Sequence, residues 1–203
     1  MSYMISDVFT VNELATADDV YRLDPHFHPD LIVDGGGNIG LFTLRTVAEQ
    51  QARGNTSMTA IICEPIARNV EHIHRHLAAN HMEVRILEGC LGGTRRTLPF
   101  YCREAINSSF DPEKPYHEVI QVPVYLLEDA IGGSSAERIL VKLDIEGMEV
   151  EVLKAFLPGE QRAVYIVGEL HECAIHASEM ETLFHENGWT YEIWREADDQ
   201  ALF

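Results

Sequence analysis

The stretch VDGGGNIG, residues 33–40, decides the fold of this chain. It ends an apolar run over 31–34, which has the composition of a short buried strand, and it leads into an amphipathic segment over 41–51 with helical spacing. A glycine turn between a strand and a helix is typical of α/β folds, in which ligands bind at the carboxyl ends of parallel strands. The stretch therefore predicts a parallel sheet with a ligand site at this turn.

The same alternation of apolar runs and amphipathic segments continues after the turn. Consecutive β-α-β units of this kind wind right-handed and build a parallel sheet with helices packed on it. We expect strands over 59–63, 84–88, 139–143 and 163–167, and helices over 66–80 and 149–156.

The carboxyl-terminal part of the chain is expected to add one helix and a closing pair of strands. Ser178-x-x-Glu181 is a capping box, which predicts that a helix opens there, and Gly188 is expected to end it. Residues 191–194 and 201–203 have the pattern of an antiparallel pair that closes the sheet.

The middle of the chain interrupts the α/β pattern. Residues 97–102 and 119–125 alternate like paired strands, and the loop between them is polar and rich in proline, which excludes a helix. We expect an inserted β-hairpin over 97–125 at the ligand edge of the sheet, with the loop 103–118 as a lid.

The composition is that of a globular chain with a strong negative charge. Its 203 residues suit a single domain over 1–203, in which 1–30 form an extension before the first strand. The formal net charge of −18 repels phosphate backbones and so disfavours a nucleic-acid partner. No apolar run has the roughly 20 residues of a membrane span, and the cysteines show no disulfide or zinc spacing. We therefore expect a cytoplasmic protein, and homo-oligomer formation stays open.

The glycine turn fits two cofactor motifs. As GxGxxG over 35–40 it is the fingerprint of a dinucleotide such as NAD, and as DxGxNxG over 34–40 it has the form of an S-adenosylmethionine loop. The charge of Asp34 separates the two, because a carboxylate repels a pyrophosphate and stabilises the ammonium and sulfonium of S-adenosylmethionine. Glu64, at the end of the second strand, serves either cofactor by accepting the ribose hydroxyls. We favour S-adenosylmethionine and keep an NAD-dependent oxidoreductase as the alternative.

A second motif, KLDIEGMEVEVL over 142–153, ends the fourth strand and opens the next helix. Its charged residues gather at the mouth of an apolar strand, where a ligand site is expected. The structural alternative is that Glu146 and Glu149 complement the dipole of their helix, and that Lys142 pairs with one of them.

With both motifs in view, the chain resembles the FkbM-type methyltransferases, a class I family that uses S-adenosylmethionine. The matching blocks are VDGGGNIG at 33–40, Glu64-Pro65, LLED at 126–129, KLDIEGMEVEVL at 142–153 and Glu169-x-His171. The resemblance implies a Rossmann-like fold, with a mostly parallel seven-stranded sheet and helices on both faces. It also implies methyl transfer, usually to a hydroxyl oxygen, and we expect a small metabolite or sugar as the acceptor.

The resemblance also implies which residues bind the cofactor. Asp34, Gly36, Asn38 and Gly40 would hold its methionine part, Glu64 the ribose, and Gly89 or Cys90 would lie beside the adenine, with Asp144 near the sulfonium. Gly37 departs from the family, which commonly has alanine at this position.

A hydroxyl acceptor needs a base, and Asp144, Glu169 and His171 are the candidates. Asp144 ends the fourth strand and His171 follows the fifth, so both reach one pocket if these strands are neighbours. His171 is the candidate whose ordinary pKa lies near neutrality. A hard divalent cation is the alternative use of the three residues, but spacing in sequence does not establish convergence in space, so no metal ligand is assigned.

Other residues carry weaker signals. Ser108 and Ser109 either touch the ligands or form a polar loop tip, and His72 and His76 are expected on a solvated helix face. A third function class, an S-adenosylmethionine-binding protein without catalysis, also stays open.

Overall fold

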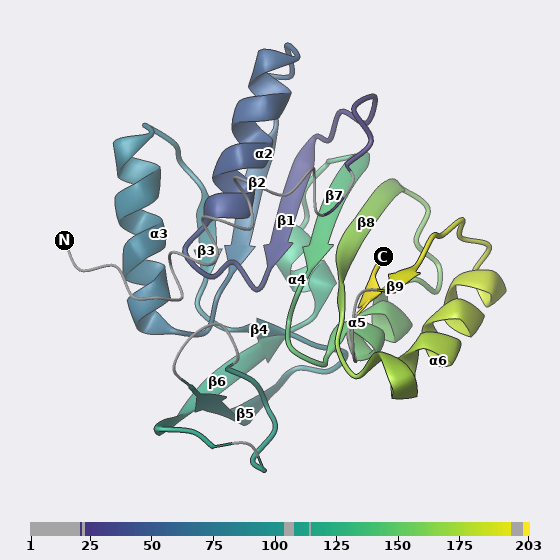
Figure 1. The fold of residues 1–203 in the computed structure, drawn as a ribbon. Coiled ribbons are helices and arrows are strands. Elements are labelled where there is room, and N and C mark those ends of the chain that lie inside the picture. Colours follow the sequence, from purple (N-terminus) through teal and green to yellow (C-terminus); the bar gives the residue numbers. More distant parts are fainter. Residues whose placement is uncertain (1–20, 22, 104–107, 114, 196–200) are drawn as a thin grey trace.

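The computed structural model describes residues 21, 23–103, 108–113, 115–195 and 201–203 (Figure 1). Most of the extension expected over 1–30 and part of the expected lid loop therefore lie outside the described residues. Within them, a seven-stranded sheet carries helices on both faces, and a three-stranded sheet lies beside its carboxyl edge (Figure 1).

The main sheet is mostly parallel, as the sequence predicts. Its central strand β1 (Leu31–Gly35) pairs in parallel with β2 on one side and β7 on the other. Antiparallel pairing is confined to the end of the sheet, where β10 pairs with β8 and β9. The full order is β3 (Arg85–Leu87), β2 (Thr59–Cys63), β1, β7 (Arg138–Leu143), β8 (Ala163–Leu170), β10 (Ala201–Leu202) and β9 (Trp194–Arg195). The carboxyl ends of β1, β2, β7 and β8 therefore meet at one edge.

Alternate side chains of the strands point to opposite faces of the sheet, and helices pack against each face. Ile32 packs with Phe42 and Val47 of α2 (Leu41–Ala52), and Ile62 packs with Ile73 of α3 (Ala67–Ala79). The opposite face, with Leu31 and Val33, belongs to the cluster that covers α4 (Leu127–Ile131), α5 (Glu149–Phe156) and α6 (Cys173–Glu186). The period of two along each strand thus places one helix layer on each face.

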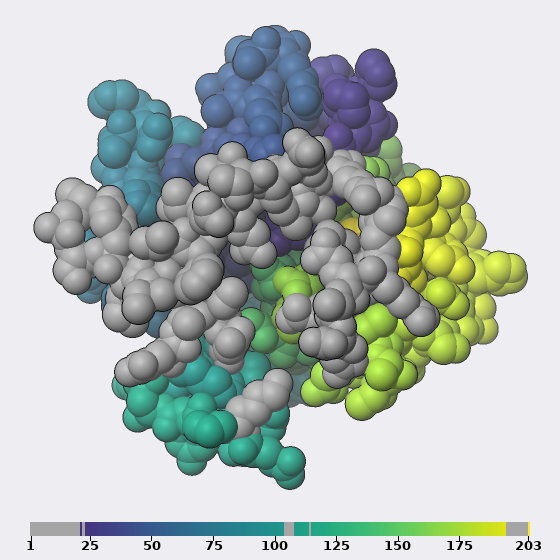
Figure 2. Space-filling view, in the orientation of Figure 1, coloured from purple at the N-terminus to yellow at the C-terminus, as the bar shows by residue number. Residues whose placement is uncertain are grey.

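The predicted hairpin forms the second sheet. Strands β5 (Arg96–Cys102) and β6 (Glu118–Tyr125) pair antiparallel, and β4 (Cys90–Leu91) adds a parallel strand to the other side of β6. The small sheet has its own apolar cluster of Cys90, Phe100, Cys102 and Val122. In the space-filling view it forms a lobe at the lower end of the molecule (Figure 2). Strand β4 was not expected, because two residues are too short for a periodic pattern.

The capping box at Ser178 does not open a helix, so this prediction was wrong. Helix α6 begins at Cys173, and Ser178 is an exposed residue inside it. Cys173, Ala177, Met180 and Phe184 form one buried stripe, so burial extends the helix towards β8. The chain turns from β8 into α6 at Glu172, which has a positive φ of 53°.

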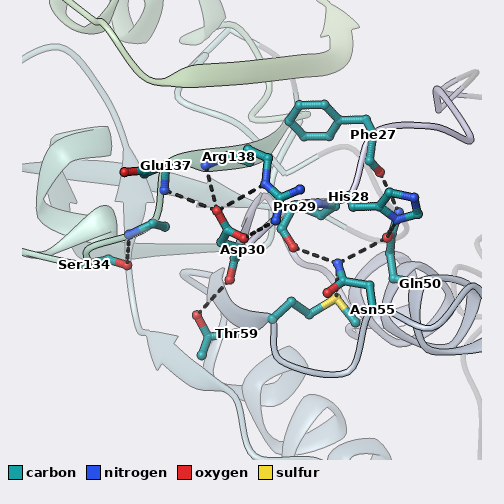
Figure 3. A network of polar contacts seen from close by, with 12 residues as sticks. Phe27, His28, Pro29, Asp30, Gln50, Asn55, Thr59, Ser134, Glu137 and Arg138 are labelled. Atoms are coloured by element: carbon teal, nitrogen blue, oxygen red, sulfur yellow. Dashed lines mark hydrogen bonds and ion pairs between the residues drawn. The ribbon is translucent and has the colours of Figure 1, made fainter.

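A polar network fixes the amino ends of the strands, opposite the glycine turn (Figure 3). Asp30, just before β1, accepts hydrogen bonds from Arg138 Nη2 at 2.6 Å and from the backbone N–H of Arg138 at 3.0 Å. The hydrogen bond from the Arg138 guanidinium lowers the pKa of Asp30. His28 Nδ1 lies 3.3 Å from Gln50 Oε1 in the same network. His28 therefore holds the loop before β1 in place, at the edge remote from the candidate site.

The described residues contain no helix that is long and apolar enough to cross a membrane. The four cysteines are buried and unpaired in this structure.

Candidate active site

The glycine turn after β1 is fixed by the ends of both neighbouring strands. The backbone N–H groups of Gly36 and Gly37 donate to the carbonyl oxygen of Cys63, at the end of β2, at 3.1 and 3.0 Å. On the other side, the N–H of Asp144 donates to the carbonyl oxygen of Gly35 at 3.2 Å. The turn is therefore held at the carboxyl edge of the sheet between β2 and β7.

Two glycines of the turn are required by close approach. A Cβ on Gly36 would lie 1.8 Å from the carbonyl oxygen of Asp144, and the φ of Gly36 is +75°. A Cβ on Gly37 would lie 2.1 Å from Ile62 Cγ2. The alanine that FkbM-type methyltransferases commonly have at the position of Gly37 therefore does not fit this packing without a shift.

Lys142 joins the two motifs. Its ammonium donates to the carbonyl oxygen of Gly36 at 2.7 Å, and it lies 3.5 Å from Asp34 Oδ1 and 3.3 Å from Asp144 Oδ2. Burial by itself would lower the pKa of Lys142, but the charges of Asp144 and Asp34 raise it, so the side chain is a buried cation. The structural alternative, a pairing of Lys142 with Glu146 or Glu149, does not describe this contact, because Lys142 faces Asp34 and Asp144.

Asp34 is fully buried beneath the turn. Its Oδ2 accepts a hydrogen bond of 2.7 Å from the Thr43 hydroxyl, and its Oδ1 faces Lys142 without a hydrogen bond. Asp34 therefore links the glycine turn to α2 through Thr43 and to β7 through Lys142.

Glu64 is also buried, at the end of β2. Its Oε1 accepts hydrogen bonds from the N–H of Ile66 and from Asn69 Nδ2, both at 3.0 Å, and its Oε2 accepts one from the N–H of Asn38 at 2.9 Å. Burial raises the pKa of Glu64 to about 7, although these hydrogen bonds favour the charged form. Glu64 therefore ties the turn, through Asn38, to the start of α3.

Gly89 and Cys90, the expected adenine neighbours, follow β3. The N–H of Gly89 donates to the carbonyl oxygen of Glu64 at 3.1 Å, which places Gly89 beside the end of β2. Cys90 is buried in the core of the small sheet, and burial raises the pKa of its thiol. Gly89 is thus the better placed of the two for a ligand at the glycine turn.

Asp144, Glu169 and His171 converge, as the predicted neighbouring strands require. Strands β7 and β8 pair in parallel, and one donor atom from each of the three residues lies within 4.8 Å of the others. All three are partly exposed. The structure therefore brings the candidate bases into one cluster next to the glycine turn.

His171 is held by two glutamates. Its Nδ1 lies 2.9 Å from Oε1 of the buried Glu149, and its Nε2 lies 3.5 Å from Glu146 Oε2. Burial lowers the pKa of His171, but the hydrogen bond with Glu149 and the charges of Glu149, Glu146 and Asp144 raise it to about 9. Burial also raises the pKa of Glu146 to about 7, against the opposing charge of His171. The near-neutral pKa that favoured His171 as a base does not hold here, because the ring is surrounded by carboxylates.

Sequence reasoning missed three contributors to the site. The hydroxyl of Tyr21 donates to Asp144 Oδ2 at 3.3 Å, Thr43 holds Asp34, and Glu149 orients His171. Glu149 also accepts hydrogen bonds from the N–H groups of Ile145 and Gly147. Only Glu149 gave a signal, as an acidic residue in the second motif, and it was interpreted as a helix-dipole partner.

Other singled-out residues lie elsewhere. Ser108 and Ser109 are buried in the hairpin, where the Ser108 hydroxyl accepts from the N–H of Arg103 at 2.9 Å. Of the two alternatives for these serines, the polar loop tip does not fit, because both hydroxyl-bearing side chains are buried within the hairpin. His76 Nδ1 lies 2.8 Å from the carbonyl oxygen of Ile39, which ties α3 to the glycine turn.

Comparison with known proteins identifies the fold. No protein-family model matches the sequence, and no curated protein matches it. The crystal structure of the methyltransferase FkbM from Methylobacillus flagellatus KT is similar to this chain, with a TM-score of 0.57 and 14% sequence identity, over 94% of this chain and 46% of that one. A ribosomal protein L11 methylase from Lactobacillus delbrueckii subsp. bulgaricus gives a TM-score of 0.48 and 9% identity, over 85% of this chain and 66% of that one. The tRNA methyltransferase TrmK of B. subtilis gives a TM-score of 0.44 and 12% sequence identity, over 88% of this chain and 60% of that one.

The similarity to FkbM shows that the chain has a Rossmann-like α/β fold like that of this methyltransferase, which confirms the fold expected from the sequence. At 14% identity the similarity to FkbM shows the fold alone, and the chain spans about half the length of that protein. A fold does not determine an acceptor, which depends on the residues of the site.

Proposed function

We propose that this protein transfers the methyl group of S-adenosylmethionine to a hydroxyl oxygen of a small molecule. The observation that carries the proposal is the contact between the two motifs, in which a Cβ on Gly36 would lie 1.8 Å from the carbonyl oxygen of Asp144. The turn expected to hold the donor and the carboxylate expected to serve the acceptor therefore adjoin. Methyl transfer needs this adjacency, because acceptor oxygen, methyl carbon and sulfur must be aligned.

The cofactor would be held by the turn and by the ends of β2 and β3. In this proposal Gly36, Asn38 and Gly40 contact its methionine part, while the buried Asp34, paired with Lys142, supports the turn from below. Glu64 Oε2 accepts one hydrogen bond, from Asn38, and a carboxylate oxygen has capacity for a second, from a ribose hydroxyl. Gly89 would adjoin the adenine. When bound, S-adenosylmethionine supplies the activated methyl group.

In the transfer itself, the acceptor oxygen forms a bond to the methyl carbon while the carbon–sulfur bond breaks and its electron pair stays on sulfur. The hydroxyl proton leaves to a carboxylate, which we assign to Asp144, with Glu169 and His171 beside it. A base placed in this way typically contributes ~10²–10⁴-fold to the rate. Asp144 suits this role because its side chain is 29% exposed and its position is fixed by Lys142 and Tyr21.

The charge of the protein favours one class of acceptor. The net charge of −18 and the carboxylates of the site oppose a polyanionic acceptor such as RNA and are compatible with a neutral or cationic hydroxyl compound. The buried, unpaired cysteines support a reducing compartment, which we take to be the cytoplasm.

The test is a transfer assay with S-adenosylmethionine labelled in its methyl group. Three acceptor pools would be compared, namely small hydroxyl compounds including sugars, bulk tRNA, and unfractionated protein. We expect label in the small-molecule pool and a loss of label with Asp144→Asn. Label in RNA or protein instead would overturn the acceptor class, and binding of NAD in place of S-adenosylmethionine would overturn the function.

A further inference from the structure

We propose that Asp144, Glu169 and His171 form a binding site for one divalent cation of the Mg²⁺/Mn²⁺ class. The inference deepens the proposed function, on which its catalytic meaning rests, but the binding site itself rests on the geometry of the three residues. Two carboxylates and one imidazole supply two oxygen donors and one nitrogen donor, a mixed set that suits Mn²⁺ and tolerates Mg²⁺.

The three donor atoms are close enough for one ion. They lie within 4.8 Å of one another, and all belong to partly exposed side chains that an ion can reach. Metal–oxygen bonds of about 2.1 Å place ligands on opposite sides of an ion about 4.2 Å apart. Only one pair of three ligands can lie on opposite sides, and adjacent ligands lie about 3.0 Å apart, so two neighbouring side chains would move towards each other by up to about 2 Å in total to close the site around a cation.

The backbone holds the ligands in register. Asp144 directly follows β7, Glu169 lies in β8, and His171 directly follows β8. The two strands pair in parallel from Arg138 with Ala163 to Leu143 with Gly168, so the ligands come from rigid neighbouring elements. Metal sites built on such elements keep their geometry better than sites on loops.

An independent feature orients the imidazole. Glu149 comes from α5, is almost completely buried, and lies 2.9 Å from His171 Nδ1. A carboxylate at one ring nitrogen is the usual outer partner of a metal-bound histidine, because it fixes the ring and leaves the other nitrogen for the metal. In this site the remaining nitrogen, Nε2, is on the side of Glu146, at 3.5 Å from its Oε2. Glu149 is therefore a positioning residue for the proposed metal ligand.

The charge around the cluster also favours a cation. Four carboxylates, those of Asp144, Glu146, Glu149 and Glu169, lie around His171, and they outnumber the one ammonium, that of Lys142, which faces the cluster from the side of the glycine turn. Three protein donors leave positions on an octahedral ion for water and for the acceptor oxygen. A cation there would lower the pKa of a bound hydroxyl. With the ion bound, Asp144 acts as a ligand, and the hydroxyl proton leaves to water in place of Asp144.

The experiment measures metal binding without donor or acceptor. Purified wild-type protein is stripped with a chelator, dialysed, and titrated with Mn²⁺ in 150 mM salt, and free Mn²⁺ is followed by its paramagnetic resonance signal. The salt suppresses diffuse binding to a chain of net charge −18. We expect one bound Mn²⁺ per chain, competed by Mg²⁺.

Variants locate the ion. Asp144→Asn, Glu169→Gln and His171→Gln should each weaken Mn²⁺ binding at least tenfold, and Glu149→Gln should weaken it by about 10–100-fold, the usual effect of losing an outer partner. The matched control is Glu172→Gln, the same change three residues beyond Glu169 at an exposed glutamate. It should bind as wild type does. Circular dichroism confirms that each variant is folded.

The outcomes separate the two proposals. No saturable binding, or binding that all four site variants retain, would overturn the metal site and leave the methyltransferase proposal standing. Binding at the site by a protein that does not bind S-adenosylmethionine would support the metal site and overturn the proposed function.

Discussion

The ammonium of Lys142 donates a 2.7 Å hydrogen bond to the carbonyl oxygen of Gly36 and so ties the end of β7 to the glycine turn after β1. The same ammonium lies between the carboxylates of Asp34 and Asp144. One buried cation therefore fixes the backbone of the proposed donor site and the position of the proposed base.

Removing this cation should destabilise the protein. Lys142→Met leaves Asp34 buried and unpaired, and losing one partner of a buried ion pair costs about 3–5 kcal/mol. Urea unfolding followed by circular dichroism measures the change. Lys154→Met is the control, because Lys154 pairs with Glu179 on the surface and such pairs contribute at most about 1 kcal/mol. Equal stability of the two variants would contradict the role given to Lys142.

Gly37→Ala tests the packing of the turn. The new Cβ would lie 2.1 Å from Ile62 Cγ2, and overpacking of this kind costs about 1–3 kcal/mol. In a double-mutant cycle, Ile62→Ala should remove part of the penalty, so the two changes should cost less together than their sum. If the two substitutions changed the unfolding free energy by strictly additive amounts, the strain of Gly37→Ala would not come from its contact with Ile62.

Glu64 should make stability depend on pH. Its pKa in the folded protein is raised from 4.5 to about 7, so the folded state binds the proton more tightly than the unfolded state. Its contribution to stability is therefore full below about pH 4.5 and is lost as the pH rises through 7, by about 3 kcal/mol at 1.36 kcal/mol per pKa unit.

The measurement compares unfolding free energies at several pH values for wild type, Glu64→Gln and the exposed control Glu88→Gln. The difference between Glu64→Gln and wild type should shift in favour of the variant between pH 5 and pH 8, by roughly the amount expected from the pKa. The control should follow wild type. A constant difference for Glu64→Gln would mean that Glu64 is not the titrating group.

Ser178→Ala tests where α6 begins. A serine that caps a helix contributes about 1 kcal/mol, whereas an exposed serine inside a helix changes stability by less than about 0.5 kcal/mol. Because α6 begins at Cys173, we expect the small effect in urea unfolding. A loss of about 1 kcal/mol would restore the capping interpretation.

The sequence predicted the parts of the site that depend on chain order. VDGGGNIG predicted the turn, and the order of strands predicted that Asp144 and His171 reach one edge, because consecutive parallel strands tend to be neighbours. The capping-box motif at Ser178 gave a wrong helix start, because a local motif carries no information about which residues are buried. The buried apolar residues from Cys173 to Phe184 determine where the helix lies.

The remaining parts depend on tertiary contacts that local patterns do not encode. Lys142 meets Gly36 across the sheet, Glu149 meets His171 from a different element, and Tyr21 reaches Asp144 from before the first strand. From the sequence alone, Lys142 could equally be a salt-bridge partner, Glu149 a helix-dipole partner, and Tyr21 an ordinary aromatic side chain. Only the fold selects the contact that forms.

The most direct test of the account is calorimetric titration of the wild-type protein with S-adenosylhomocysteine, the demethylated cofactor, and in parallel with NAD. The account predicts saturable one-to-one binding of S-adenosylhomocysteine, weakened in Glu64→Gln by about 1–3 kcal/mol, the range for a hydrogen bond to a charged group, and no heat with NAD. Saturable binding of NAD, or no binding of S-adenosylhomocysteine by the folded protein, would contradict it.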